Sequence, residues 1–379
     1  MSNATGRSLR EFAEKMVELE IATEEQATAG LAETESFGMD LDEKYENLEE
    51  LTFLIGECGL GFTTPEKAVG DLEEGYEDLL RDAAACSGGS VVVDDVALVK
   101  VEDGAEREEY LHFRRNGRSI WHRTEHLSDS TRYMDWTTLF DAIGDLVPGN
   151  EDPRGFFQVD EDSYDAQWLL LTSGQAEGLK EFGLSVPVGL GNWVRDGLPS
   201  AEPETSAWYV EDDRLHASEE SRRCLAEWLA PMDDALARWR SAHVPAGFPF
   251  DHSPDSLTAL ERLVLERFDG PAALEAGAGA GDAFYEGAVR YLGETALRLW
   301  PCRWTYQYTD DATSVFGNEP RISVNAPDGF GGGFSPDHAL RTLVRERTHG
   351  VVRECVDDLG ESVESYRAAL RALDAHSRY

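Results

Sequence analysis

The sequence has few lysines, no paired cysteines and no long apolar run. Only five of its 34 basic residues are lysine, and 74 acidic residues leave a formal net charge of -40 at pH 7 over 379 residues. A field of this sign repels nucleic-acid backbones and anionic membranes. The charge therefore predicts a chain that binds neither nucleic acid nor membrane.

The cysteines stand singly, and their odd number without a C-x-x-C pair argues against both a disulfide framework and a zinc ribbon. No stretch approaches the ~20 apolar residues that a membrane span needs, and the N-terminal residues are polar and helix-periodic. No nucleotide or cofactor fingerprint occurs, so we expect no cofactor. The chain is expected to be cytoplasmic, with reduced thiols at Cys58, Cys86, Cys224, Cys302 and Cys355.

The acidity has two interpretations. An acidic surface keeps a protein soluble whatever it binds, as salt-adapted proteins require. It also accelerates association with a basic protein partner and makes that association sensitive to salt. Composition alone leaves both alternatives open.

Nine Trp, 12 Tyr and 16 Phe supply ample material for a buried core, and the length suggests roughly two to three domains. The patterns predict an α+β fold with two small helix-plus-antiparallel-sheet domains joined by a helical linker region. The expected segments are a helical N-terminal extension (1–63), an α+β domain (64–185), a linker with an amphipathic helix (186–252) and a C-terminal α+β domain (253–379).

In the first α+β domain we expect a helix from Thr64-Pro65-Glu66, where threonine can cap and proline fits the first turn. Strands follow, with Asn116-Gly117 as a tight turn between two of them. The predicted order is helix, three strands, helix, two strands and a helix opened by Thr172 or Ser173. These strands are expected to form one mostly antiparallel sheet covered on one face.

Beyond a Pro/Gly-rich stretch at 186–206, residues 218–242 predict a single helix with an apolar stripe. The C-terminal module predicts two helices, two strands that form a short hairpin-like sheet, a Gly-rich loop and two more helices, the first beginning at Ser335-Pro336. That loop lacks the Lys-Ser/Thr ending of a P-loop, so we interpret it as a connection capped by Ser335.

One string has a catalytic pattern: His122-Arg123-Thr124-Glu125-His126 resembles the H-x-x-E-H motif of inverted zinc peptidases. On a helix, His122 and His126 would share one face and a zinc ion, with Glu125 as general base. On a strand, the two histidines would stand about 13 Å apart, too far for one metal. The preceding hairpin signal favours a strand. No G-x-S-x-G elbow occurs, and the excess of carboxylates singles out no acid/base pair.

The second candidate site is Glu294, Arg303 and Trp304. A carboxylate on an otherwise apolar helix is costly unless paired, and Arg303 is an evident partner for Glu294. Residues 287–294 read G-A-V-R-Y-L-G-E and precede Trp304. Through this pattern, residues 255–350 resemble a bacterial family of unassigned function. The resemblance implies a fold but no reaction. The middle region loosely resembles acidic α+β immunity proteins that block basic toxins.

These observations favour a non-enzymatic protein that binds a basic protein partner, in the manner of an immunity or inhibitor factor. One alternative is a zinc-dependent hydrolase using His122, Glu125 and His126. Another is a nucleic-acid mimic, in which rows of carboxylates imitate phosphates and occupy a DNA-binding protein.

Overall fold

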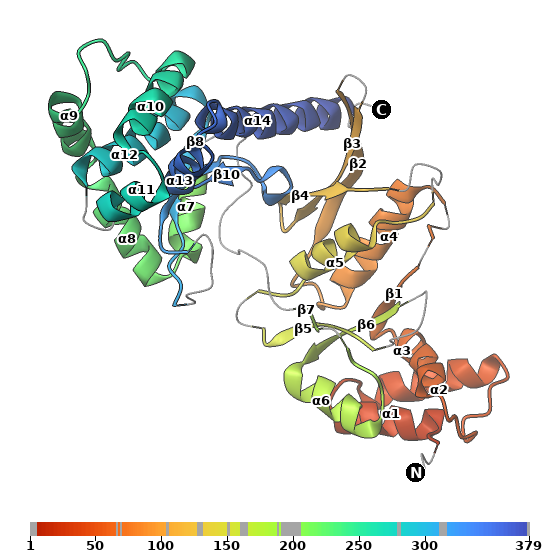
Figure 1. Cartoon of the computed structure of the whole chain (residues 1–379). Coiled ribbons are helices and arrows are strands. Elements are labelled where there is room, and N and C mark those ends of the chain that lie inside the picture. Colours follow the sequence, from red (N-terminus) through yellow and green to blue (C-terminus); the bar gives the residue numbers. More distant parts are fainter. Residues whose placement is uncertain are drawn as a thin grey trace. The chain divides into compact units, whose positions relative to one another are not determined.

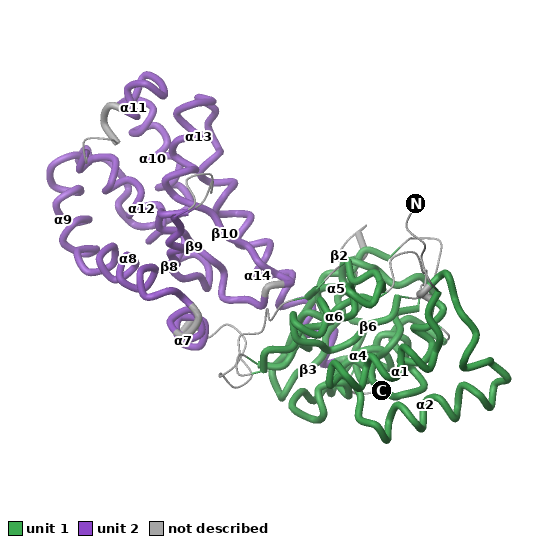
Figure 2. Tube along the Cα trace, turned by 90° about the horizontal axis from the view of Figure 1, so that it is seen from below, with its two compact units in different colours: residues 1–200, 375–379 green, residues 201–374 purple. Residues whose placement is uncertain are grey.

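The chain divides into two compact units, residues 1–200 with 375–379 and residues 201–374 (Figure 2). Both combine helices with small antiparallel sheets, so the predicted α+β class is confirmed (Figure 1). The computed structural model describes residues 6–65, 67–68, 70–103, 106–126, 132–149, 152–159, 166–187, 189–190, 206–278, 282–310 and 317–376.

The first unit begins with helices whose starts are set by capping boxes. The Ser8 hydroxyl accepts the Glu11 N–H while the Glu11 carboxylate accepts the Ser8 N–H, and Thr23 and Gln26 repeat the arrangement. Reciprocal pairing of this kind satisfies N–H groups that a helix start leaves without partners. The prediction of helices between residues 8 and 58 is confirmed by α1 (Leu9–Glu18), α2 (Glu24–Ser36), η1 (Leu48–Thr52) and α3 (Phe53–Glu57).

Strand β6 (Ala166–Thr172) has an unbroken apolar run because both faces of its sheet are covered. Trp168 and Leu170 join a core with α4 (Leu72–Ala85) and α5 (Trp136–Asp145). Leu169 and Leu171 join a second core with α1, α3 and α6 (Ser173–Phe182). Successive side chains on a strand point to opposite faces, so a sheet between two cores needs apolar residues at every position. The strand order is β1-β6-β5-β7, all antiparallel. Its other members are β1 (Gly61–Thr64), β5 (Arg154–Gln158) and β7 (Gly189–Leu190).

The second sheet of this unit is a meander with the order β2-β3-β4. Asn116 and Gly117 have φ values of 49° and 80° and connect β3 to β4, as the tight-turn signal predicts. Leu98, Leu111 and Phe113 face α4 and α5 in the shared core. The elements are α4 (Leu72–Ala85), β2 (Val93–Asp103), β3 (Glu106–Arg115), β4 (Arg118–Thr124), α5 (Trp136–Asp145) and α6 (Ser173–Phe182).

Two expectations for this region are wrong. The strands form two sheets rather than one, because β1 pairs with β6 and so assembles a separate sheet with β5 and β7. Thr64 is no helix cap: it ends β1, and its hydroxyl accepts the Trp168 indole N–H at 3.2 Å. The helix starts at Leu72 instead, where the Asp71 carboxylate accepts the Glu74 N–H.

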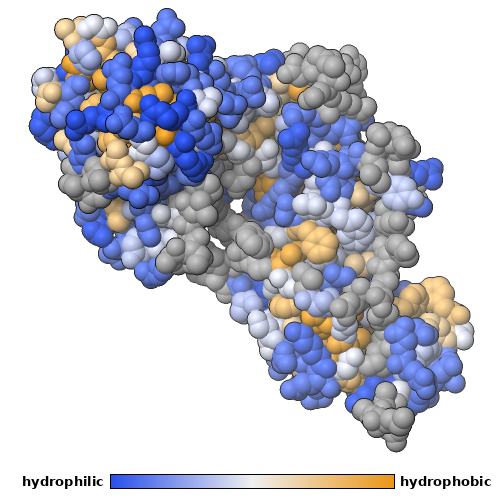
Figure 3. Space-filling view, viewed as in Figure 1, coloured by the Kyte–Doolittle hydropathy of each residue, from blue (hydrophilic) through white to orange (hydrophobic). Residues whose placement is uncertain are grey.

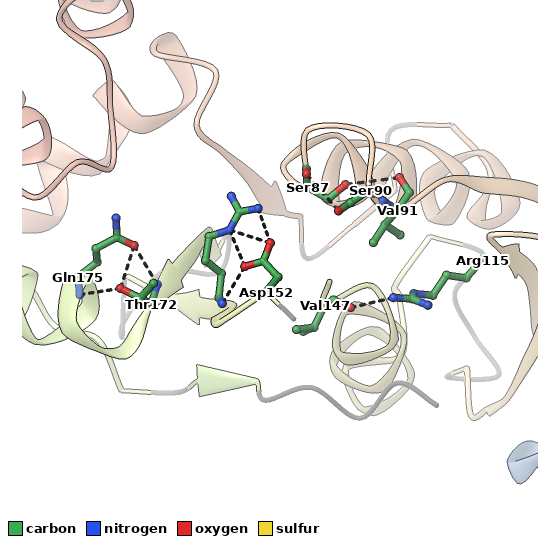
Figure 4. A network of polar contacts seen from close by, with 9 residues as sticks. Ser87, Ser90, Val91, Arg115, Val147, Asp152, Thr172 and Gln175 are labelled. Carbon is green, nitrogen blue, oxygen red and sulfur yellow. Dashed lines mark hydrogen bonds and ion pairs between the residues drawn. The ribbon is translucent and has the colours of Figure 1, made fainter. Parts of the chain in front are cut away.

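Polar contacts order the loops and helix starts of this unit (Figure 4). The buried Arg115 donates from Nη2 to the Val147 carbonyl at 3.0 Å, which joins the end of β3 to the end of α5. The Thr172 hydroxyl accepts the Gln175 N–H and so begins α6, as predicted. Side-chain donors here satisfy carbonyls, and side-chain acceptors satisfy N–H groups, that lie outside the regular ladders.

The second unit is built around α12 (Ala283–Leu299), whose residues are buried almost throughout. It packs against α9, α10 and α13 and against strands β8 and β9. An added Cβ at Gly287 would overlap the Trp239 ring, so glycine permits α9 to approach closely. Antiparallel strands β8 (Cys302–Tyr306), β9 (Pro320–Val324) and β10 (Gly333–Phe334) form the sheet of this unit in the order β10-β9-β8.

The helices of residues 206–376 differ from the prediction in two respects. The single helix expected over 218–242 is interrupted at Pro231, since proline cannot continue the hydrogen-bond ladder. Helices α7 and α11 were not predicted, whereas Ser335 caps α13 as expected. Within the described residues, no helix combines the length and apolar character needed to cross a bilayer. The helices are α7 (Ser206–His216), α8 (Glu219–Leu229), α9 (Met232–Ala242), α10 (Pro254–Arg267), α11 (Pro271–Ala278), α12, α13 (Pro336–Glu346) and α14 (Val351–His376).

Candidate functional site

The predicted zinc motif lies on and just after a strand, not on a helix. His122 is in β4, and its Nε2 forms a 2.9 Å hydrogen bond with Asp145 of α5. His126 follows the strand, and its Nδ1 lies 2.5 Å from Glu109 of β3. The Glu125 side chain is exposed. Each histidine therefore has its own carboxylate partner.

This geometry contradicts the zinc-hydrolase alternative. A shared metal needs His122 and His126 one helical turn apart, and the extended backbone of β4 separates them instead. Among the residues that the structure describes, no group of three or more His, Cys, Asp or Glu side chains could hold one metal ion. The motif match arises from a hairpin strand rather than from a catalytic helix.

His126 is instead the middle of a buried chain of hydrogen bonds. The Tyr76 phenol accepts the Asp135 N–H at 3.0 Å and shares a hydrogen bond with Nε2 of His126, 2.9 Å away. Nδ1 of His126 donates to the Glu109 carboxylate, which can only accept. Burial raises the pKa of Tyr76 far above its usual value, which keeps the phenol protonated. Tyr76 has no exposed surface. These hydrogen bonds therefore connect α4 to β3 and do not present a nucleophile to solvent.

The thiols of Cys58, Cys86, Cys302 and Cys355 are equally unsuited to nucleophilic chemistry. Burial raises the pKa of Cys58, Cys86 and Cys355 to about 11 and that of Cys302 to about 12. A thiol reacts as its thiolate, and these pKa values leave almost none at neutral pH.

The second predicted site is assembled with different partners. The Trp304 indole N–H donates to Glu294 Oε1 at 2.9 Å, so the expected pairing of Glu294 with Arg303 is wrong. Arg303 donates from Nε and Nη2 to the two oxygens of Asp213, at 2.6 and 3.2 Å, and from Nη1 to the Val324 carbonyl. Asp213 belongs to α7, a helix that sequence patterns missed.

The side chains of Glu294, Arg303 and Trp304 connect α12, β8 and α7. Trp304 is 6% exposed and the Arg303 side chain is 11% exposed. A bidentate arginine and carboxylate pair is among the stronger polar contacts in proteins. The polar atoms named here are directed into the fold, which leaves little surface for a ligand.

The second unit also has an open hollow in its surface. It has a volume of about 530 Å³ and is lined by α9, by the segment before α10 and by Arg298 near the end of α12. Arg240 and His252 contribute to its wall. Local sequence patterns do not reveal these residues, because three separate segments supply them. The spacing of residues along the chain does not indicate that arginines on different helices lie close together.

The first unit exposes two aromatic rings within a segment of the chain that is rich in acidic residues. Phe37 at the end of α2 is 62% exposed and Phe53 at the start of α3 is 40% exposed. Their ring centroids lie 6.0 Å apart at an interplanar angle of 82°. Residues 21–63 contain Lys44 as their single basic residue, against the acidic residues Glu24, Glu25, Glu33, Glu35, Asp40, Asp42, Glu43, Glu46, Glu49, Glu50 and Glu57.

Comparisons with known proteins identify no relative. No family model, curated protein or solved structure matches the chain. The resemblance of residues 255–350 to a bacterial family stays a prediction, and the function is argued from the residues themselves.

Proposed function

We propose that this chain is a non-enzymatic protein that binds a basic protein partner through the surface formed by Phe37, Phe53 and the acidic side chains around them. The observation that carries the proposal is this exposed aromatic pair in a segment with eleven acidic residues and one basic residue. Hydrophilic residues cover most of the described surface in Figure 3, and exposed aromatic pairs on such surfaces favour binding.

The two kinds of side chain serve different steps of association. Exposed carboxylates attract a basic protein over about 8 Å at physiological salt and raise its association rate. The aromatic rings supply the apolar anchors that retain the partner after contact. Glu33, Glu35 and Asp40 are exposed and form no ion pair within the described part of the chain, so their charge is available to a partner.

The partner that fits this surface is a basic effector or toxin domain, which the chain would block as an immunity or inhibitor factor in the cytoplasm. Blocking needs tight binding rather than chemistry. The protonated thiols of Cys58 and Cys86 and the separately paired histidines His122 and His126 are compatible with such a role.

The first experiment is affinity capture of the tagged full chain from its host's lysate, washed at low and then moderate salt. Binding of the captured protein is then measured with both proteins purified, by titration calorimetry over a salt series. We expect one stoichiometric basic partner whose affinity falls as salt rises. An acidic partner, or affinity unchanged by salt, would overturn the proposal. Displacement of the partner by a DNA fragment would instead identify the nucleic-acid mimic.

Variants locate the surface. Phe37→Ala with Phe53→Ala should weaken binding by about tenfold or more, because apolar anchors typically contribute over 1 kcal/mol each. Leu229→Ala, an exposed apolar residue in the other unit, is the control. A second comparison removes three acids from the surface (Glu33→Gln, Glu35→Gln and Asp40→Asn) or three exposed acids elsewhere (Glu266→Gln, Asp269→Asn and Glu361→Gln). Only the first set should weaken binding and flatten its salt dependence.

A further inference from the structure

The hollow in the second unit combines two cationic groups with an apolar wall. Arg240 of α9 and Arg298 of α12 both line it. Neither forms an ion pair or hydrogen bond within the described residues, although the chain has more than twice as many acidic as basic residues. The Arg240 guanidinium lies 4.8 Å from the centre of the Phe250 ring, a cation–π contact that orients it. Two guanidinium groups without partners on one concave wall form a receptor for an anion.

His252 lines the same wall, and its hydrogen bonds define its tautomer. The Thr295 hydroxyl donates to the Tyr291 carbonyl at 2.7 Å, so it can only accept from Nδ1 of His252, 3.0 Å away. Nδ1 therefore carries the ring proton, and Nε2 keeps its lone pair. Burial and the charge of Arg298 lower the pKa of His252 to about 4, which keeps the ring neutral at physiological pH.

The backbone also holds His252 in place. Its φ of +57° lies in the left-handed region, which non-glycine residues adopt rarely and at a cost. The His252 N–H donates to the Tyr291 hydroxyl at 3.2 Å, and the imidazole stacks on the Tyr291 ring with centroids 4.6 Å apart. The contacts with Tyr291 and Thr295 together hold the imidazole in one position.

The remaining wall residues restrict the class of ligand. Asp233 carries a negative charge at the hollow, while Leu236 and Phe250 supply apolar surface. An inorganic dianion would meet the Asp233 carboxylate and leave the apolar wall uncovered. A molecule with one carboxylate, one ammonium group and an apolar body matches each feature.

We propose that this hollow binds an apolar α-amino acid. Its carboxylate lies against Arg240 and Arg298, and its ammonium group donates to Nε2 of His252 and faces Asp233. Its side chain packs on Phe250 and Leu236. This small-molecule site is independent of the acidic surface of the first unit, and the chain alone suffices to test it.

The test is calorimetric titration of the full chain with L-leucine and L-phenylalanine, with inorganic phosphate as the anion control. We expect saturable, one-to-one binding of at least one amino acid and none of phosphate. Arg240→Gln and Arg298→Gln should each weaken binding by about tenfold, because each removes a charge-assisted hydrogen bond. Arg238→Gln is the matched control, since Arg238 is exposed on α9 and does not line the hollow.

Arg240 and Arg298 are both exposed, so the variants should fold, and unchanged circular dichroism will verify this. His252→Asn provides a second variant, because asparagine tolerates the left-handed backbone. It should also weaken amino-acid binding. Failure of both amino acids to bind would overturn the proposal. Phosphate competing at equal affinity, or binding unchanged in both arginine variants, would overturn it as well.

Discussion

The indole N–H of Trp304 donates a hydrogen bond to the carboxylate of Glu294 across 2.9 Å. This contact joins β8 to the long helix α12 and gives a partly buried carboxylate its partner. The Trp304 ring also packs on the Trp228 ring of α8, with centroids 5.7 Å apart. A single side chain therefore connects three elements of the second unit.

Trp304→Phe should destabilise the protein by about 1–3 kcal/mol, because it removes the N–H that satisfies the Glu294 carboxylate. Glu294→Gln should cost less, since an amide oxygen still accepts from the indole. Urea denaturation of both variants and of the double variant measures the coupling between them. Strictly additive effects of the two substitutions would show that the negative charge of Glu294 adds nothing to this hydrogen bond, and unchanged stability of Trp304→Phe would show that the bond itself contributes nothing.

Gly293→Ala should also be destabilising. An added Cβ at this position would overlap the Trp304 ring, and overpacking a core typically costs about 1–3 kcal/mol. That cost exceeds the gain of up to about 1 kcal/mol that alanine brings to a helix. Gly174→Ala in α6 is the control, because its Cβ meets no atom within 4 Å and the substitution should stabilise. Thermal unfolding of the two variants should shift in opposite directions.

Asp213→Asn should destabilise the protein by about 3 kcal/mol, because it leaves the nearly buried Arg303 guanidinium without its carboxylate. The matched control is Glu211→Gln in the same helix, which breaks the solvent-accessible pair of Glu211 with Arg214 and should change little. Chemical denaturation compares the two. Equal stability of both variants would show that the ion pair of Arg303 with Asp213 does not stabilise the protein.

Stability should fall in acid through His112. Burial lowers the pKa of His112 to about 4, against about 6.5 in the unfolded chain. The unfolded state therefore binds the proton first as pH falls. The contribution of His112 to the free energy of unfolding is complete above pH 6.5 and is lost between about pH 6.5 and 4. It amounts to about 3 kcal/mol.

His112→Gln isolates this effect. Glutamine does not titrate, so urea denaturation from pH 8 to 4 should lose less stability in the variant than in the unmodified chain. Identical pH profiles of the two proteins would contradict the assignment.

The sequence predicted most elements of the first unit because their signals are local. The Asn116-Gly117 turn, the Thr172 cap and the helix periods depend on residues a few positions apart. The partition of the strands into two sheets was not predicted, since it depends on the pairing of β1 with β6. Those strands lie about a hundred residues apart in the chain, and no alternation of side chains specifies such a partner.

The candidate sites follow the same rule. The pattern at residues 122–126 indicated a hairpin strand, which the structure confirms, but it could not name Asp145 and Glu109 as the partners of the two histidines. The pairing of Arg303 with Asp213 connects residues 90 positions apart. The chain has 74 acidic residues, so each basic side chain has many carboxylates with which it could pair. The composition does not indicate which of them is the partner.

The sequence by itself determined the strong negative charge, the α+β class and most of the order of helices and strands. These follow from residue counts, short-range periodicity and turn chemistry. Tertiary structure alone decided which carboxylate each base meets, how the strands divide into sheets and where Arg240, Arg298 and His252 form a hollow. Such contacts arise when packing brings distant segments together, because charge and hydrogen bonding act through space rather than along the chain.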